Sequence, residues 1–255
     1  MIKNIKQFIK YLRRDISKSF LYSQASFDYI LKDKIYAFFK CKDDRFFIIK
    51  GNDNNVEFEN EKKMIIDSFE KNKVNTSVSE RGLGFSKSML LEDVPDIFLR
   101  IIKKHQEEIK KYLGEEILFE KPLFFRNYNI DSKFSSFDVY SNIWHQDSHD
   151  GNRLLKIFIL TDNVSEDDGP FHWLNEDQTR ANWEKLRDRW TFDVFSKVQK
   201  IPGENILIGD VGSYLILDTS RCMHKAGIPK KYRNMLQLTL YPQWRERKGR
   251  YEKRI

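Results

Sequence analysis

The sequence predicts a mainly β protein with flanking helices, an α+β chain whose core is a sandwich or a jelly roll. Three observations support this fold class: short apolar or alternating runs crowd the residues after Gly114, clusters of Asp, Gly, Asn and Pro separate those runs, and most helical periodicity precedes them. Short strands with turns between them favour a sandwich over a parallel α/β sheet. The eight candidate strands are, in order, Leu118–Tyr128, Phe137–His145, Leu154–Val164, Pro170–Leu174, Asn205–Gly209, Ser213–Leu217, Arg221–Ala226 and Arg233–Tyr241.

Helical spacing of apolar residues predicts the elements that flank and interrupt these strands. We expect helices over Met1–Arg14, Glu57–Lys71 and Asp96–Leu113, and a helical insert near residues 177–198. The glycine that follows Leu113 is typical of a helix end. The chain therefore divides into a helical and hairpin region over residues 1–93 that packs on the core, a core over residues 94–244, and a basic tail over residues 245–255.

The composition narrows the class of protein. The 255 residues include 20 Phe, 11 Tyr and 5 Trp, enough large apolar side chains for a sizeable core. The two cysteines, Cys41 and Cys222, exclude a disulfide scaffold and a thiolate metal cluster and indicate a reducing compartment, so we expect a cytoplasmic protein. No apolar run approaches the roughly 20 residues that cross a bilayer, and no signal-peptide pattern follows Met1. The net charge of +7 is compatible with nucleic acid, anionic lipid or anionic metabolites as partners.

Two His-x-acid patterns occur in the sequence, and the predicted backbone distinguishes them. His105-x-Glu107 lies in a predicted helix, where side chains two residues apart point in different directions. His145-x-Asp147 ends a predicted strand, where side chains two residues apart share one face and can bind one ion. The second pattern is therefore the candidate for a metal site, and an ordinary pair of polar residues beside a turn is the alternative.

A third candidate ligand, His224, lies in a later predicted strand, and Arg233 opens the last one. Two imidazoles and one carboxylate are the ligands of the facial triad that holds non-haem Fe(II) and leaves three positions open. Those positions would take a chelating co-substrate and dioxygen, and a planar, permanently charged arginine can bind the far carboxylate of that co-substrate through two hydrogen bonds. Taken singly, His224 is also typical of a core imidazole, and Arg233, close to Lys230 and Lys231, of a surface cation.

Together these residues resemble the phytanoyl-CoA dioxygenase family, a branch of the Fe(II)/2-oxoglutarate-dependent oxygenases built on a double-stranded β-helix, the cupin-like jelly roll. The resemblance spans about Val94 to Pro242 and rests on the motifs His145-x-Asp147, Lys156–Val164, Gly169–Pro170–Phe171, His224 and Arg233. It implies that His145, Asp147 and His224 bind iron and carry catalysis. It also implies that Arg233 binds the C5 carboxylate of 2-oxoglutarate, with Fe(II) as cofactor and with 2-oxoglutarate and dioxygen as co-substrates.

The activity that the resemblance implies is hydroxylation of a small molecule with release of succinate and CO2. Asp147 favours hydroxylation, because related halogenases have a small residue at that position. The sequence departs from the family after Gly169–Pro170, where Phe171 and His172 begin a run that differs from the usual pattern, and the phytanoyl substrate is not carried over. Anionic, lipid-related and glycan-related small molecules are the expected substrate classes, and Gln146, Phe171 and His172 are the candidate substrate contacts.

Three alternatives remain open at the level of sequence. The first is a non-catalytic jelly-roll or cupin-like binding protein. The complete set of metal ligands and the presence of Arg233 are evidence against it. The second is a nucleic-acid oxygenase. Such enzymes usually carry another arginine six residues after the first, where this chain has Thr239, so we expect no nucleic-acid partner.

The third alternative concerns the location of the protein, because the basic amphipathic helix Met1–Arg14 either contacts a membrane surface or packs on its own domain. The sequence does not determine the oligomeric state.

Overall fold

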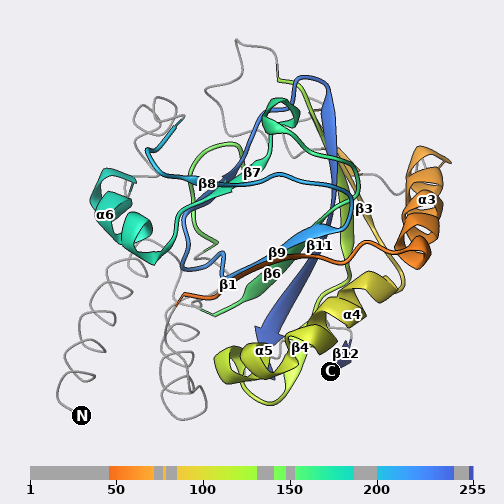
Figure 1. Ribbon diagram of the computed structural model, residues 1–255, viewed down its shortest axis with the longest axis horizontal. Helices are drawn as coiled ribbons and strands as arrows, with labels where there is room; N and C mark the ends of the chain where they lie inside the picture. The colour runs from red at the N-terminus through yellow and green to blue at the C-terminus, as the bar shows by residue number, and fades with distance from the viewer. Residues whose placement is uncertain are drawn as a thin grey trace.

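The computed structural model describes residues 46–71, 77–78, 85–130, 141–147, 153–186, 200–243 and 253–254. The predicted helix Met1–Arg14 and Cys41 lie outside these residues, as do much of the helical insert and most of the basic tail. In the part of the chain that the structure describes, short strands form two sheets and helices lie beside them (Figure 1).

The larger sheet contains nine strands of the described residues, and antiparallel ladders join them. β4 (Ile117–Phe119) pairs with the end of the longest strand and with β12 (Lys253–Arg254). The predicted strand Leu118–Tyr128 is two strands, because Pro122 between them has no backbone N–H to donate to a ladder. From edge to edge, the order is β1 (Ile48–Asn52), β9 (Ser213–Leu217), β6 (Leu155–Leu160), β11 (Tyr232–Pro242), β5 (Leu123–Tyr128), β3 (Ser86–Leu90) and β2 (Ser77–Val78).

The smaller sheet has three short antiparallel strands. Their order is β10 (His224–Ala226), β7 (Phe171–Trp173) and β8 (Asn205–Leu207). An isolated bridge between His145 and His224 places the segment 141–147 directly beside β10.

Alternation of side chains along the strands divides the interior into two layers. On β6, Ile157 and Ile159 point into a hydrophobic cluster shared with the helices, whereas Phe158 and Leu160 point into a second cluster shared with the smaller sheet. From the smaller sheet, Trp173 enters the second cluster. The two sheets thus pack face to face in a jelly-roll core, and the mainly β fold class predicted from the sequence is confirmed.

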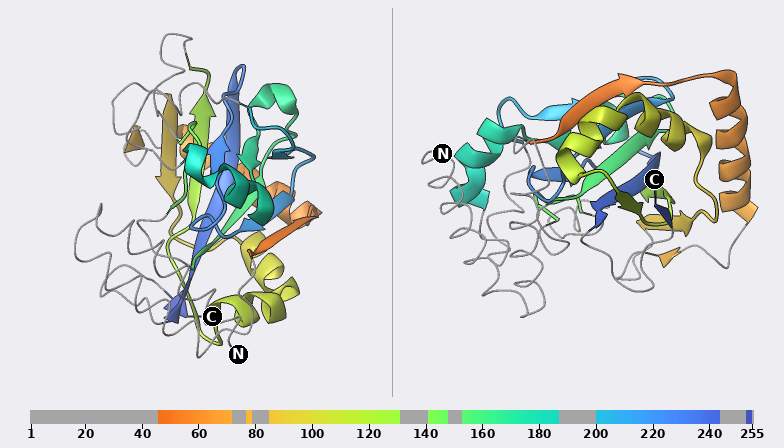
Figure 2. Two further views of the ribbon diagram at one scale, coloured as in Figure 1. Left: turned by 90° about the vertical axis from the view of Figure 1, so that its left-hand side faces the viewer. Right: turned by 90° about the horizontal axis from the view of Figure 1, so that it is seen from below.

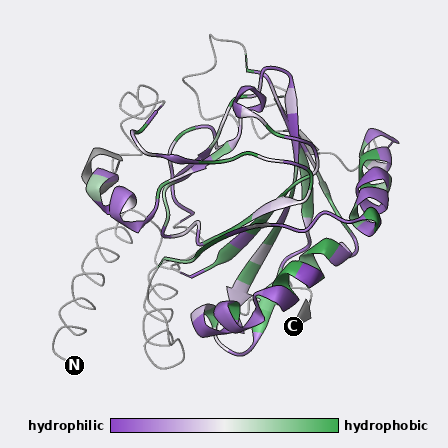
Figure 3. Ribbon diagram, viewed as in Figure 1, coloured by the Kyte–Doolittle hydropathy of each residue, from purple (hydrophilic) through white to green (hydrophobic). Residues whose placement is uncertain are grey.

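Helices cover the face of the larger sheet that is turned away from the smaller one. α4 and α5 follow one another along this side (Figures 1 and 2), and hydrophobic bands alternate with hydrophilic ones on α3 and α4 (Figure 3). Among the described helices, none is long and apolar enough to span a bilayer. The helices are α3 (Val56–Lys71), α4 (Asp96–Lys104), α5 (Gln106–Leu113) and α6 (Glu176–Leu186), with a 3-10 helix, η3 (Glu166–Asp168), ahead of β7.

The predicted helix Asp96–Leu113 is interrupted at His105. This residue leaves the helical backbone conformation, with φ −113° and ψ 22°, and its Nε2 lies 2.8 Å from Tyr214 Oη on β9. α5 ends before Gly114, whose φ of 99° is readily adopted by glycine, as the sequence predicts.

The region before residue 94 contributes directly to the larger sheet. β1 pairs with β9 at one edge, and β3 pairs with β5 near the other. This region therefore extends the core sheet as well as packing on it, and the domain boundary at residue 93 stays a prediction.

Candidate metal centre

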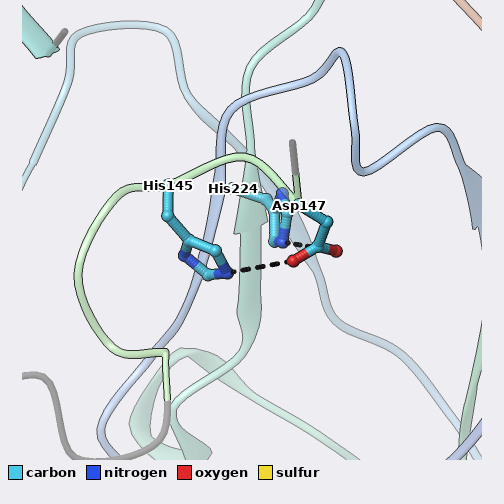
Figure 4. Close-up of side chains that lie close together, drawn as sticks. All are labelled: His145, Asp147 and His224. Carbon is cyan, nitrogen blue, oxygen red and sulfur yellow. Dashed lines mark ion pairs between the residues drawn. The ribbon is translucent and has the colours of Figure 1, made fainter. Parts of the chain in front are cut away.

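The structure brings the three predicted ligand residues together where the segment 141–147 runs beside β10. Two backbone hydrogen bonds of 2.9 Å join His145 to His224 and place the imidazoles side by side, with ring centroids 4.2 Å apart. Asp147 turns its carboxylate toward both rings (Figure 4), with 3.8 Å from His145 Nε2 to Oδ1 and 3.6 Å from His224 Nε2 to Oδ2. The three buried side chains offer ligand atoms within 4.8 Å of one another, close enough to hold one metal ion.

Backbone carbonyls hold both imidazoles in the form that suits a metal ligand. His145 Nδ1 lies 2.8 Å from the carbonyl oxygen of Ile143, and His224 Nδ1 lies 3.0 Å from that of Cys222. Because a carbonyl can only accept, each Nδ1 carries the proton, and each ring turns its Nε2 toward the site, the nitrogen that carries the lone pair in the neutral form. Such outer hydrogen bonds orient the ring and raise its basicity as a ligand.

Asp147 carries the negative charge of the site, and Lys156 on β6 balances it. Lys156 shares its strand face with Phe158 and therefore points into the interior, where its Nζ lies 2.8 Å from Asp147 Oδ2. Burial by itself would raise the pKa of the Asp147 carboxyl, but the charge of the Lys156 ammonium and its hydrogen bond hold that pKa well below its ordinary value. The carboxyl is therefore ionised at neutral pH, which is the form that binds a metal.

Arg233 lies on β11 and faces the same interior. It pairs with Asn127 of β5 and shares its strand face with Met235, a member of the cluster between the two sheets. Its side chain is almost completely buried, with a relative exposure of 2%, and Nη1 donates to the carbonyl of Gly169. A buried guanidinium has the chemistry to bind a carboxylate, and its contact with 2-oxoglutarate stays a prediction.

Two of the predicted substrate contacts lie beside the ligands. The ring of Phe171 stacks against that of His224, with centroids 5.5 Å apart and an interplanar angle of 26°. Gln146 is buried, and its amide Nε2 donates to the carbonyl of Arg221. This geometry makes Phe171 a wall of the site and gives Gln146 a structural hydrogen bond, while their contacts with a substrate stay predictions.

The third predicted substrate contact, His172, is directed away from the ligands. It alternates with Phe171 along β7 and points to the opposite face, where its Nδ1 lies 3.0 Å from Glu204 Oε1. Burial and the neighbouring Lys225 lower the pKa of His172 to about 4, although Glu204 acts in the opposite direction. His172 is therefore neutral at pH 7 and donates its Nδ1–H to Glu204, and its substrate role stays a prediction that this placement does not support.

Two features of the site have little signal in the sequence. Lys156 is a single cation in an apolar strand, and its position on the same face as Phe158 is the pattern that could have identified it. The other feature is the set of backbone carbonyls, such as that of Cys222, that orient the ligands. A backbone acceptor cannot be identified from the residue types in a sequence, because every residue carries one.

Comparisons with known proteins identify the fold. No family model matches the sequence, and no curated protein matches it. HygX from Streptomyces hygroscopicus, solved with nickel, 2-oxoglutarate and hygromycin B bound, aligns with a TM-score of 0.51 at 14% identity, over 82% of this chain and 86% of that chain. SnoN, an epimerase solved with Fe3+, alpha-ketoglutarate and nogalamycin RO, aligns with a TM-score of 0.52 at 12% identity, over 78% of this chain and 79% of that chain. At these identities the likeness shows a shared fold.

Proposed function

We propose that this chain is a non-haem iron, 2-oxoglutarate-dependent dioxygenase that hydroxylates a small molecule and releases succinate and CO2. The observation that carries the proposal is the buried group of His145, Asp147 and His224, in which both rings present Nε2 and the carboxyl is ionised. HygX and SnoN, which share the fold, each hold a metal together with 2-oxoglutarate, and this supports the same pair of cofactor and co-substrate here.

The donor set fits Fe(II), because two imidazole nitrogens and one carboxylate form the facial triad of non-haem iron oxygenases. When bound, iron with 2-oxoglutarate and dioxygen supplies the oxidising chemistry that amino-acid side chains lack. The residues of the chain orient and shield this site. Lys156 holds the Asp147 carboxylate, Phe171 covers the His224 ring, and Arg233 offers its guanidinium to a carboxylate of 2-oxoglutarate.

The substrate in this proposal is a small molecule of an anionic, lipid-related or glycan-related class, and nucleic acid is not a partner. HygX holds hygromycin B and SnoN holds nogalamycin RO, which supports a small-molecule substrate for a site on this fold. Interior cations such as Lys156 and Arg233 favour ligands that carry negative charge.

The first test measures the metal and co-substrate complex and its turnover. Anaerobic addition of Fe(II) and 2-oxoglutarate should give the weak visible absorption band of the chelate, and dioxygen should then release succinate. His145→Ala and His224→Ala should lose both signals and keep a native circular dichroism spectrum, because each removes a ligand. His105→Gln is the matched control, since it replaces an imidazole that contacts Tyr214 outside the site.

The outcomes separate the proposed function from its alternatives. A folded wild-type protein that gives no band would favour a non-catalytic binding protein. Succinate release screened over phosphorylated sugars, acyl thioesters, amino acids and glycosides would identify the substrate class, and stimulation by short DNA or RNA would contradict the small-molecule proposal. A product that gains one oxygen atom supports hydroxylation, whereas a product of unchanged mass would point to epimerisation, the reaction for which SnoN is named.

We also propose a cytoplasmic location with peripheral membrane contact through residues 1–14. The support is compositional: five basic residues lie among apolar ones in this stretch, and the chain has only two cysteines. Removing residues 1–14 should reduce co-sedimentation with anionic liposomes, and unchanged co-sedimentation would contradict the membrane contact.

A further inference from the structure

The loop between β9 and β10, residues 218–223, contacts the segments that carry the ligands. The carbonyl of Thr219 accepts the backbone N–H of Asp147 at 2.9 Å. The carbonyl of Cys222 accepts the Nδ1–H of His224 at 3.0 Å. One loop backbone therefore helps to set the place of the carboxylate and the orientation of an imidazole.

Asp218 holds this loop in its conformation. Its Oδ1 accepts the N–H of Ser220 at 2.8 Å, the hydroxyl of Ser220 at 2.5 Å and the N–H of Arg221 at 3.2 Å. The carbonyl of Arg221 in turn accepts the amide of Gln146, which lies between two ligands in the chain. Asp218 is fully buried, so these hydrogen bonds do not compete with water.

Tyr112, at the end of α5, contacts both this loop and Arg153, which leads into β6. Its hydroxyl donates to Asp218 Oδ2. Its carbonyl accepts Nη1 of Arg153 at 2.8 Å, and the Arg153 guanidinium lies 4.7 Å from the centroid of its ring. Arg153 belongs to the stretch of chain that leads from Asp147 into β6. One buried tyrosine thus contacts both the loop between β9 and β10 and the residue that leads into β6.

The phenol of Tyr112 is the donor in this contact, and burial raises the pKa of the Asp218 carboxyl that accepts it. Burial, followed by the charge of Asp218, raises the pKa of Tyr112 well above its ordinary value, so the phenol keeps its proton and acts as a donor. Removing the phenol hydroxyl would leave Asp218 Oδ2 without this donor in a buried setting, where an unsatisfied acceptor is costly. The loop would then lose one of the contacts that determine its position.

We propose that the Tyr112–Asp218 hydrogen bond is a positioning element of the metal centre. Neither residue is a ligand, and their effect reaches the ligands through the carbonyls of Thr219 and Cys222. The inference rests on the proposed function, because that function requires a metal at this site.

The test is metal binding by the full-length chain without turnover. Co2+ added to the metal-free protein reports affinity and ligand geometry through its visible absorption. Tyr112→Phe should weaken Co2+ binding by up to about 10-fold and alter the spectrum, the lower end of the effect of losing a direct partner of a ligand, because Tyr112 acts one step further out; Tyr214→Phe should change the affinity less than about 2-fold. Tyr214 is the control because it is equally buried and lies in the same hydrophobic cluster. Its hydroxyl contacts His105, whereas the Tyr112 hydroxyl donates to Asp218 and also accepts from Arg221 Nη1 at 3.4 Å.

Each outcome of the Co2+ experiment supports or contradicts the positioning role of the Tyr112–Asp218 hydrogen bond. Equal affinities of wild type and Tyr112→Phe, or equal losses in Tyr112→Phe and Tyr214→Phe, would overturn the inference and leave the proposed function intact. A folded wild-type protein that binds no Co2+ would overturn both. Should Tyr112→Phe not fold, Asp218→Asn replaces it, because asparagine keeps an oxygen for the loop N–H groups and puts an amide where Oδ2 accepts the Tyr112 hydroxyl. A weakened affinity would then support the inference, and an unchanged one would contradict it.

Discussion

Two cations and one carboxylate, Lys156, Arg233 and Asp147, determine the charge inside the site at the residue scale. All three face the space between the sheets, and Lys156 forms an ion pair with Asp147. A buried charge is costly unless an opposite charge compensates it. Lys156 and Asp147 compensate each other, and the planar cation of Arg233 has the chemistry to bind an anionic co-substrate.

His172 makes the stability of the protein depend on pH. Its pKa lies at about 4 in the folded protein against an ordinary value of 6.5. Between these values the unfolded chain binds a proton that the folded chain does not, so stability is lost as the pH falls from 6.5 toward 4. From about pH 7.5 to about pH 5 the free energy of unfolding should fall by roughly 2 kcal/mol on account of this residue.

Urea denaturation at the two pH values measures this loss. His172→Gln should show a flatter dependence on pH, because glutamine can still donate to Glu204 and does not titrate. An equally steep loss of stability in the variant would assign the effect to another group.

The turn between η3 and β7 links two parts of the site at the element scale. Gly169 adopts a left-handed conformation with φ +63°, and its carbonyl accepts the guanidinium of Arg233. Phe171 follows two residues later, and its ring stacks against the imidazole of His224. The conformation of this one turn therefore positions both an aromatic wall and the candidate carboxylate-binding residue.

Gly169→Ala should destabilise the fold more than Gly203→Ala. Both glycines have positive φ, so alanine costs about 1–2 kcal/mol of backbone strain at either position. A Cβ on Gly169 would also lie 2.3 Å from the backbone nitrogen of Pro229, whereas one on Gly203 would meet the flexible end of Gln178 at 2.9 Å. We expect an additional cost of about 1–3 kcal/mol for Gly169→Ala in urea denaturation. Equal losses would show that the contact with Pro229 relaxes without cost.

At the scale of the whole molecule, the candidate metal site lies where the smaller sheet faces the larger one. His224 comes from the smaller sheet, and Asp147 comes from the segment beside it and pairs with Lys156 of the larger sheet. An ion bound here would hold the segment 141–147 to β10 in the folded state, and the unfolded chain would not form such a site.

Metal binding should therefore stabilise the protein against unfolding. Co2+ at about 100 times its dissociation constant should add about 2.7 kcal/mol to the free energy of unfolding. Asp147→Asn should lose most of this gain, because it removes the charged ligand, and a chelator should reverse the gain in the wild type. An increase of equal size in Asp147→Asn would place the bound metal elsewhere.

Local patterns predicted most of the fold and the residue types of the site. Alternation in Arg233–Tyr241 predicted the centre of β11, and the helix end at Gly114 followed from the glycine alone. The break at His105 could not be predicted, because it lacks a glycine or proline signal and coincides with a contact to Tyr214 on a distant strand.

The sequence by itself determined the mainly β class and the set of side chains with ligand chemistry, because periodicity, turn residues and donor types are local properties. Only the tertiary structure decided which of these side chains meet. The register of β7 against β10 pairs Trp173 with His224 on the interior side and His172 with Lys225 on the other. Strand register is set by packing between distant segments, and a shift of one residue reverses which side chains point inward. His172 and His224 both lie in short apolar strands of the smaller sheet, and the register turns His224 toward Asp147 and His172 toward Glu204.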